Sequence, residues 1–179
     1  MPIPIEQVAA FAEGPFQGNP AAVCPLQSWL PDPIMQAIAA ENNLSETAFY
    51  VGREGRYALR WFTPRCEVDL CGHATLAAGH VVFLHEPHLD EVEFRSNSGP
   101  LIVRRQGDQL ILNFPVQPVC SCLAPGGVDE ILGTTAEACF LGVDLMVVVA
   151  DQHEVEALAP DYAAVAELRR LRCRRRRRA

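Results

Sequence analysis

The sequence predicts a mixed α+β fold in which short strands surround one buried helix. Residues 72–84 carry almost no charge and favour a helix, and a helix that is apolar on every side is normally buried inside a larger structure. Short strand-like segments lie on both sides of this helix and are separated by turn-forming glycine and proline. Short strands with few helices are typical of the α+β class.

The strands are predicted from short apolar or alternating runs that end at turn residues. Gly18, Asn19 and Pro20 form one such turn, directly before the second of these runs. In chain order, the expected strands are residues 3–11, 21–24, 46–51, 57–62, 91–96, 101–105, 110–114, 138–141 and 145–150.

Helices are expected at four places. In the first, residues 31–43, Asp32 is the expected N-cap and Pro33 lies in the first turn. Ile34, Ile38 and Leu44 are expected to mark its buried face. The others are residues 72–84, 128–132 and 155–168, the last as one helix or two.

Prolines around residues 115–125 indicate a domain boundary. We therefore expect a first domain at residues 1–117 and a partial second domain at 118–168. The second region has few strands and no turn-rich closing section. Residues 169–179 form an arginine-rich tail.

The charge of the chain is unevenly distributed. The net charge is −7, lysine is absent, and eight of the fifteen arginines lie in residues 169–179. The remainder of the chain holds all 22 acidic groups. An arginine-rich tail can bind nucleic acid, but the acidic body argues against such a partner. We interpret the tail as non-native sequence that follows a truncation or frameshift.

Composition excludes several classes of protein. No apolar run approaches the roughly 20 residues that cross a bilayer, and the N-terminus does not resemble a signal peptide. A cytoplasmic protein without membrane contact is expected. Seven cysteines, an odd number without an export signal, indicate free thiols. Their spacing matches no common zinc motif, so no metal is expected.

The most informative segment is Cys71-Gly72-His73, where a turn becomes the apolar helix. The first amides of a helix lack internal partners and attract anions, and Gly72 allows a ligand to approach the backbone closely. Cys71 and His73 add groups that move protons near neutral pH. An ordinary packed junction explains this segment alone equally well.

Two further segments contain candidate site residues. Glu46 enters an apolar strand, and a carboxylate in such surroundings suits proton transfer, although a solvent-facing position is the commoner explanation. The turn at Gly18 and Asn19 can aim amide groups at a ligand carboxylate, although an ordinary tight turn explains it as well.

Taken together, the segments resemble the PhzF family of phenazine-biosynthesis-like isomerases, which share the diaminopimelate epimerase fold. The resemblance covers residues 3–165. The matching segments, in order, are residues 16–23 (FQGNPAAV), 44–49 (LSETAF), 60–64 (RWFTP), 68–75 (VDLCGHAT), 94–101 (FRSNSGPL) and 112–115 (LNFP).

This resemblance implies two similar domains, each a sheet rolled around a central helix, with the active site between them. It implies a cofactor-independent isomerase in which Glu46 is the general acid/base and His73 assists. The best-known member isomerises trans-2,3-dihydro-3-hydroxyanthranilate. Substrate binding would fall to Asn19, Ser45, Gly72 and His73, the substrate would be a small carboxylate-bearing metabolite, and a homodimer is expected.

Two alternatives remain open at this point. In related racemases and epimerases a cysteine at the position of Cys71 is a catalytic thiol, so a thiol-based amino-acid racemase is one alternative. The resemblance also implies that the second domain is incomplete and lacks the opposite wall of the site. We therefore expect this chain to be inactive or unstable alone, and a non-catalytic protein that acts by association is the second alternative.

Overall fold

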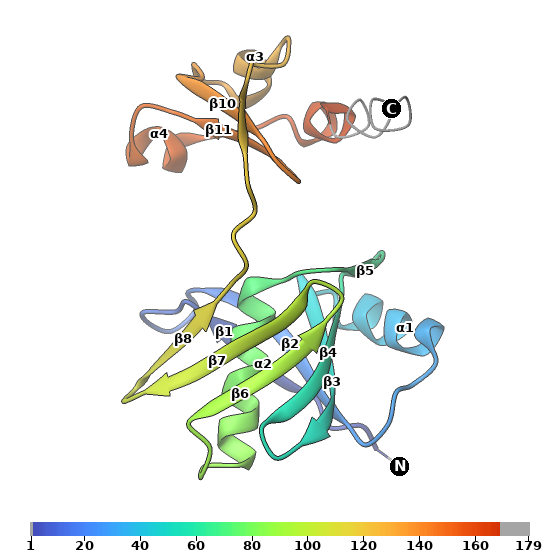
Figure 1. Cartoon of the computed structure of the whole chain (residues 1–179). Helices are drawn as coiled ribbons and strands as arrows, with labels where there is room; N and C mark the ends of the chain where they lie inside the picture. The colour runs from blue at the N-terminus through green and yellow to red at the C-terminus, as the bar shows by residue number, and fades with distance from the viewer. Residues whose placement is uncertain (1, 169–179) are drawn as a thin grey trace. The chain divides into compact units, whose positions relative to one another are not determined.

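The computed structural model describes residues 2–168, so the arginine-rich tail lies outside the described residues (Figure 1). The chain divides into two compact units, and the boundary along the sequence falls between Phe114 and Pro115. The sequence-based boundary was placed after residue 117. Each unit is described separately below.

The first unit is built from one large sheet and two helices (Figure 1). Turn residues separate most of its strands, as the sequence indicates. Its elements are β1 (Glu6–Ala10), β2 (Asn19–Leu26), α1 (Asp32–Asn42), β3 (Glu46–Arg53), β4 (Arg56–Phe62), β5 (Glu67–Val68), α2 (Gly72–His85), β6 (Glu91–Ser96), β7 (Gly99–Gln106) and β8 (Gln109–Asn113).

The sheet has eight strands in the order β1-β2-β3-β4-β6-β7-β8, with β5 paired to β4. Two neighbouring pairs, β2 with β3 and β4 with β6, are parallel, and the other pairs are antiparallel. A parallel pair needs a crossover connection, which α1 and α2 supply here. The short strand β5 was not expected from the sequence.

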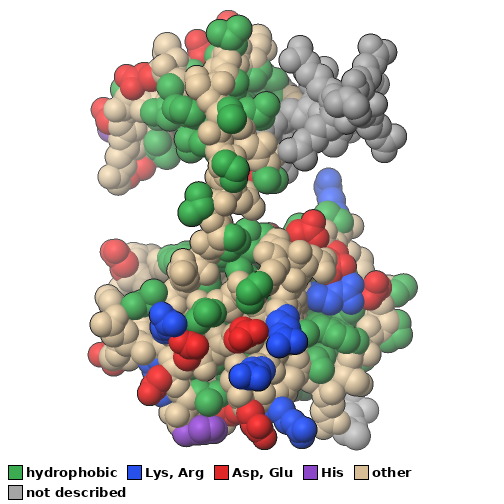
Figure 2. Space-filling view, in the orientation of Figure 1, with side chains coloured by type: hydrophobic (Ala, Val, Ile, Leu, Met, Phe, Trp, Pro, Cys, Tyr) green, Lys and Arg blue, Asp and Glu red, His purple; other side chains and the backbone are tan. Residues whose placement is uncertain are grey.

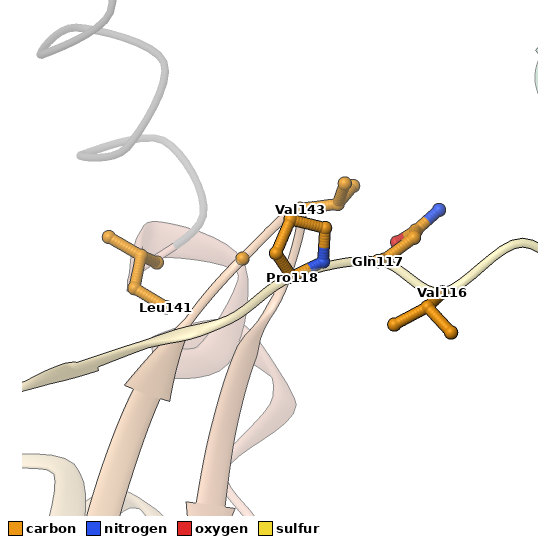
Figure 3. A pocket seen from close by; sticks show the side chains of 6 residues that line it. Val116, Gln117, Pro118, Leu141 and Val143 are labelled. Carbon is orange, nitrogen blue, oxygen red and sulfur yellow. The ribbon is translucent and has the colours of Figure 1, made fainter.

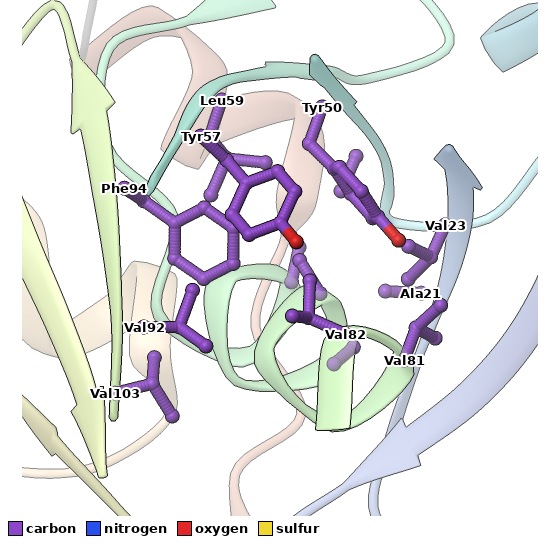
Figure 4. Close-up of a cluster of buried hydrophobic side chains, with 14 of the residues drawn as sticks. Ala21, Val23, Tyr50, Tyr57, Leu59, Val81, Val82, Val92, Phe94 and Val103 are labelled. Carbon is purple, nitrogen blue, oxygen red and sulfur yellow. The ribbon is translucent and has the colours of Figure 1, made fainter. Parts of the chain in front are cut away.

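The sheet curls around α2, which contacts strands from both ends of the strand order (Figure 4). Small side chains on this helix, such as Ala74 and Ala78, are fully buried and allow the strands to approach closely. Aromatic rings from β3, β4 and β6 close the other side of this core, where Tyr50, Tyr57 and Phe94 pack with centroids 5.1–6.4 Å apart. The expectation of a buried central helix is therefore met.

Gly79 marks the closest contact between α2 and the sheet. A Cβ atom at this position would lie 2.8 Å from Cγ1 of Val103 on β7. Glycine costs roughly 0.5–1 kcal/mol relative to alanine inside a helix, so close packing against Val103 accounts for its presence.

A second, smaller core lies between α1 and the sheet. Met35 and Ala39 of α1 are buried here with Phe49 and Phe62. Two expectations for α1 were wrong. Asp32 is not the N-cap: Pro31 precedes the helix, and the Asp32 carboxylate instead pairs with Arg60 at 2.8 Å. The buried face is also shifted: Ile34 is exposed and Met35 and Ala39 are buried, although Ile38 packs against this core as expected.

The second unit contains a three-stranded antiparallel sheet and short helices. Residues 162–168 are also helical, so the segment predicted as one or two helices forms two. Figure 2 shows many apolar side chains on this unit, and Val116, Leu123 and Val143 are among the exposed ones. Its elements are β9 (Cys120–Cys122), α3 (Val128–Leu132), β10 (Ala138–Leu141), β11 (Leu145–Val148) and α4 (Gln152–Ala157).

Within residues 2–168, no helix combines the length and apolar character that crossing a membrane requires.

Candidate active site

The candidate site lies where the start of β3 meets the N-terminus of α2. Glu46 is the first residue of β3, Cys71 is the N-cap of α2 and Gly72 is its first residue. Parallel pairing places Ala21 of β2 opposite Glu46, which brings the Gly18-Asn19-Pro20 turn to the same edge of the sheet. The sequence-predicted residues are therefore gathered by sheet pairing and by the position of α2 inside the curled sheet.

Glu46, Cys71 and His73 form a compact cluster of three ionisable side chains. Nε2 of His73 lies 3.1 Å from Oε2 of Glu46, and Nδ1 of the same ring lies 3.5 Å from Sγ of Cys71. The side chains of His73 and Glu46 are 10% and 18% exposed, and Cys71 is buried. The three groups form a triangle whose ligand atoms lie within 4.8 Å of one another, with Nδ1 of the ring near the thiol and Nε2 near the carboxylate.

Two polar atoms in this cluster lack an aligned partner. Oε2 of Glu46 and Nε2 of His73 are both buried, and neither makes a hydrogen bond of good geometry although they are close together. Buried polar groups are normally hydrogen-bonded, and unsatisfied ones often indicate a functional site. These atoms are suited to a proton, a ligand or a metal ion.

The environment sets the protonation of the cluster. Burial lowers the pKa of His73, and the nearby Glu46 carboxylate opposes that shift. Burial also raises the pKa of Cys71 to about 12, helped by Glu46 and opposed by the nearby Ala74 backbone amide. At neutral pH the imidazole is therefore mostly neutral and the thiol keeps its proton.

The N-terminus of α2 supplies backbone donors beside this cluster. No side chain caps the helix, and the first amides of any α-helix have no partner inside it. The ring of Phe114 lies over Gly72, where a Cβ would be 3.1 Å from the ring. The positive end of the helix therefore lies next to His73 and favours an anion.

Asn19 and Ser45 form a hydrogen-bonded pair at the same edge of the sheet. The Ser45 hydroxyl donates to Oδ1 of Asn19 at 3.3 Å, and both side chains are accessible. Gly18 is required before Asn19, because its φ is +82° and a Cβ would lie 2.5 Å from the Ala10 carbonyl oxygen. Asn19, Ser45 and Glu46 are thus brought to one edge, as expected of neighbouring strand ends.

Several residues that support the site were not identified from the sequence. The Thr75 hydroxyl donates to the Cys71 carbonyl at 2.5 Å and so fixes the first turn of α2. Asp69, just before this helix, accepts from the Asn97 amide at 3.2 Å, and its carbonyl accepts from the Ser98 hydroxyl at 2.8 Å. The Asn97-Ser98-Gly99 turn is a recognisable signal, but its contact with Asp69 depends on long-range sheet pairing.

A shallow hollow in the second unit has a different character. It encloses about 460 Å³ and is lined by Val116, Gln117, Pro118, Leu141, Gly142 and Val143 (Figure 3). None of these side chains is ionisable, so this hollow offers no group for acid–base chemistry. The chemically equipped site is the cluster at α2.

Comparison with known proteins agrees with this architecture. Residues 8–175 match the family model described as PhzC-PhzF, phenazine biosynthesis-like protein. An uncharacterized isomerase of Pseudomonas aeruginosa is 53% identical over 97% of this chain, and a second from the same organism is 44% identical over 94%. The chain covers 66% and 65% of those two proteins, so it spans about two thirds of their length.

Solved structures give the same result. A PhzF-family protein of Enterococcus faecalis aligns with 92% of this chain and 64% of its own, at a TM-score of 0.82 and 45% identity. A PhzC/PhzF protein of Clostridium difficile aligns at a TM-score of 0.80 and 38% identity, over 93% of this chain and 65% of its own. These matches confirm the predicted α+β class with its curled sheet. The chain belongs to the PhzC-PhzF family of phenazine-biosynthesis-like proteins.

Proposed function

We propose that this chain carries the acid–base half of a cofactor-independent isomerase that moves a proton between two carbons of a small carboxylate. Glu46 is the general acid/base. The proposal depends chiefly on one observation, the 3.1 Å separation between the Glu46 carboxylate and the His73 ring in a largely buried position. The two similar Pseudomonas aeruginosa proteins carry isomerase names, which is consistent with this class of reaction.

The cluster supports a defined arrangement of protons. With the thiol protonated, Cys71 can donate to Nδ1 of His73, which leaves the ring proton on Nε2 facing Glu46. That N–H stabilises the Glu46 carboxylate in the state that accepts a proton. Glu46 then takes a proton from one substrate carbon and returns it to another, so the enzyme ends in its starting state.

The substrate carboxylate is assigned to the N-terminus of α2. The amides of Gly72 and His73 are donors there, and the helix end favours negative charge. The Asn19 and Ser45 pair provides polar side chains at the same edge of the sheet for orientation. An anchored carboxylate holds the neighbouring carbon close to Glu46, and positioning of this kind supplies much of catalysis.

A thiol-based racemase is the competing proposal. A catalytic thiol acts as the thiolate, which a low pKa favours. The raised pKa of Cys71 and the burial of its side chain therefore favour Glu46 as the base. In our proposal Cys71 positions His73.

The test is proton exchange with solvent, followed by NMR in D2O. Because the chain spans about two thirds of its relatives, the assay uses a chimera that adds the uncovered third of the 53% identical Pseudomonas aeruginosa protein. The probe substrates are trans-2,3-dihydro-3-hydroxyanthranilate and a panel of small carboxylates. Enzyme-dependent deuterium entry at carbon supports the proposal. The proposal is contradicted if the wild-type chimera and its Glu46→Gln variant both convert substrate and neither product contains deuterium at carbon.

A further inference from the structure

We propose that Glu46, Cys71 and His73 also bind a zinc ion, which occupies the acid–base cluster. Each of the three side chains offers a ligand atom, and these atoms all lie within 4.8 Å of one another. Among residues 2–168 this is the one group of three or more metal-ligating side chains that meets that spacing.

The geometry of the pair on α2 fits a tetrahedral ion. Zinc binds sulfur at about 2.3 Å and imidazole nitrogen at about 2.0–2.1 Å, so a tetrahedral angle separates the two ligand atoms by about 3.5 Å. Sγ of Cys71 and Nδ1 of His73 are 3.5 Å apart. The pair can therefore bind one ion without moving apart.

Glu46 completes the ligand set. A carboxylate oxygen of Glu46 lies within 4.8 Å of the ligand atoms of Cys71 and His73, which is within reach of the same ion. Its Oε2 is buried without an aligned hydrogen bond, which leaves a lone pair free for a cation. Thiolate, imidazole and carboxylate are the ligands that zinc prefers, and three protein ligands leave a fourth position open.

Binding follows a simple balanced step. The S–H bond of Cys71 breaks, its proton passes to the buffer and a sulfur–zinc bond forms, with no change of oxidation state. His73 coordinates as a neutral imidazole. One proton is released for each ion bound.

This site has a consequence for catalysis, which depends on the function proposed above. A zinc ion on the Glu46 carboxylate removes the base and neutralises its charge. Zinc binding and proton transfer are therefore mutually exclusive, and zinc acts as an inhibitor of the isomerase.

The test measures metal binding without any substrate. The reduced 179-residue chain is titrated with Co²⁺, and zinc is then added to displace it. We expect one equivalent of Co²⁺ with a thiolate-to-cobalt charge-transfer band that zinc abolishes. Cys71→Ala should remove this band and weaken zinc affinity by at least about 100-fold. Glu46→Gln should weaken affinity but keep the band, since the thiolate remains.

A matched control separates this site from other thiols. A variant with serine at Cys66, Cys120, Cys122 and Cys173 should keep both the band and the affinity. If the band survives Cys71→Ala, or is lost in the control variant, the site is elsewhere and the proposal fails. Circular dichroism of each variant establishes that it is folded. Absence of metal binding would leave the isomerase proposal standing, because deuterium exchange tests that proposal separately.

Discussion

Nε2 of His73 lies 3.1 Å from Oε2 of Glu46, across the junction between the first residue of β3 and the first turn of α2. This contact joins two residues that are 27 positions apart in the chain. It exists because the sheet curls around α2. The fold therefore builds the acid–base pair, and the following predictions test each part of it.

Replacement of Cys71 by alanine distinguishes the two catalytic proposals. If Cys71 only positions His73, turnover in the chimera should change by less than about tenfold, whereas loss of a catalytic base costs about 10²–10⁴-fold. Cys71→Ser serves as the conservative control, since its hydroxyl can still donate to Nδ1 of His73. A loss of the larger size in both variants would favour the thiol-based racemase.

The thiols should differ in reactivity. Cys71 is buried with a pKa raised to about 12, whereas Cys66 is exposed. At pH 8 the folded chain should be alkylated by iodoacetamide at Cys66 much faster than at Cys71, because the thiolate is the reactive form. Peptide mass spectrometry after timed quenching measures both sites. Faster labelling of Cys71 would contradict the assigned protonation.

Asn19 should affect binding more than stability. Its hydrogen bond with Ser45 is accessible to solvent, so Asn19→Ala should lower the free energy of unfolding by only about 0.5–1.5 kcal/mol. Loss of one contact to substrate should raise KM by about tenfold, with kcat less affected. Ser45→Ala should act in the same direction. A large fall in kcat with unchanged KM would instead place Asn19 in the chemical step.

Gly79 should be important for the stability of the first unit. Gly79→Ala places a methyl group within 2.8 Å of Val103, and we expect a loss of about 1–3 kcal/mol in the free energy of unfolding. Urea unfolding followed by tryptophan fluorescence measures this change, since Trp61, one of the two tryptophans, is buried in the same core. In a double variant with Val103→Ala, the total loss should be smaller than the sum of the losses in the two single variants. Simple additivity of the two substitutions would show that the contact is not responsible.

Much of the first unit could be predicted from local sequence. The apolar run at residues 72–84 predicts α2 almost to its observed ends. A helix without a polar face is stable only when it is buried, so its central position is also predictable. The shifted face of α1 could not be predicted. That face depends on the packing of Met35 and Ala39 against Phe49 of β3 and Phe62 of β4, which are long-range contacts.

The candidate site, too, could be predicted only in part from local sequence. Local sequence marks Glu46 and the Cys71-Gly72-His73 segment as separate candidates, each with an ordinary structural explanation. Only the resemblance to a family suggested that they act together, since no periodicity predicts the parallel pairing of β2 with β3. The supporting contact of Asp69 with Asn97 and Ser98 was missed for the same reason.

The most direct test of the central claim is the rate of deuterium entry into product by the Glu46→Gln chimera in D2O. Glu41→Gln is the matched control, because Glu41 is an exposed glutamate and its substitution makes the same change of charge. We predict that Glu46→Gln lowers the rate by about 10²–10⁴-fold while Glu41→Gln leaves it unchanged. A folded Glu46→Gln variant that exchanges protons at the wild-type rate would contradict the assignment of Glu46 as the base.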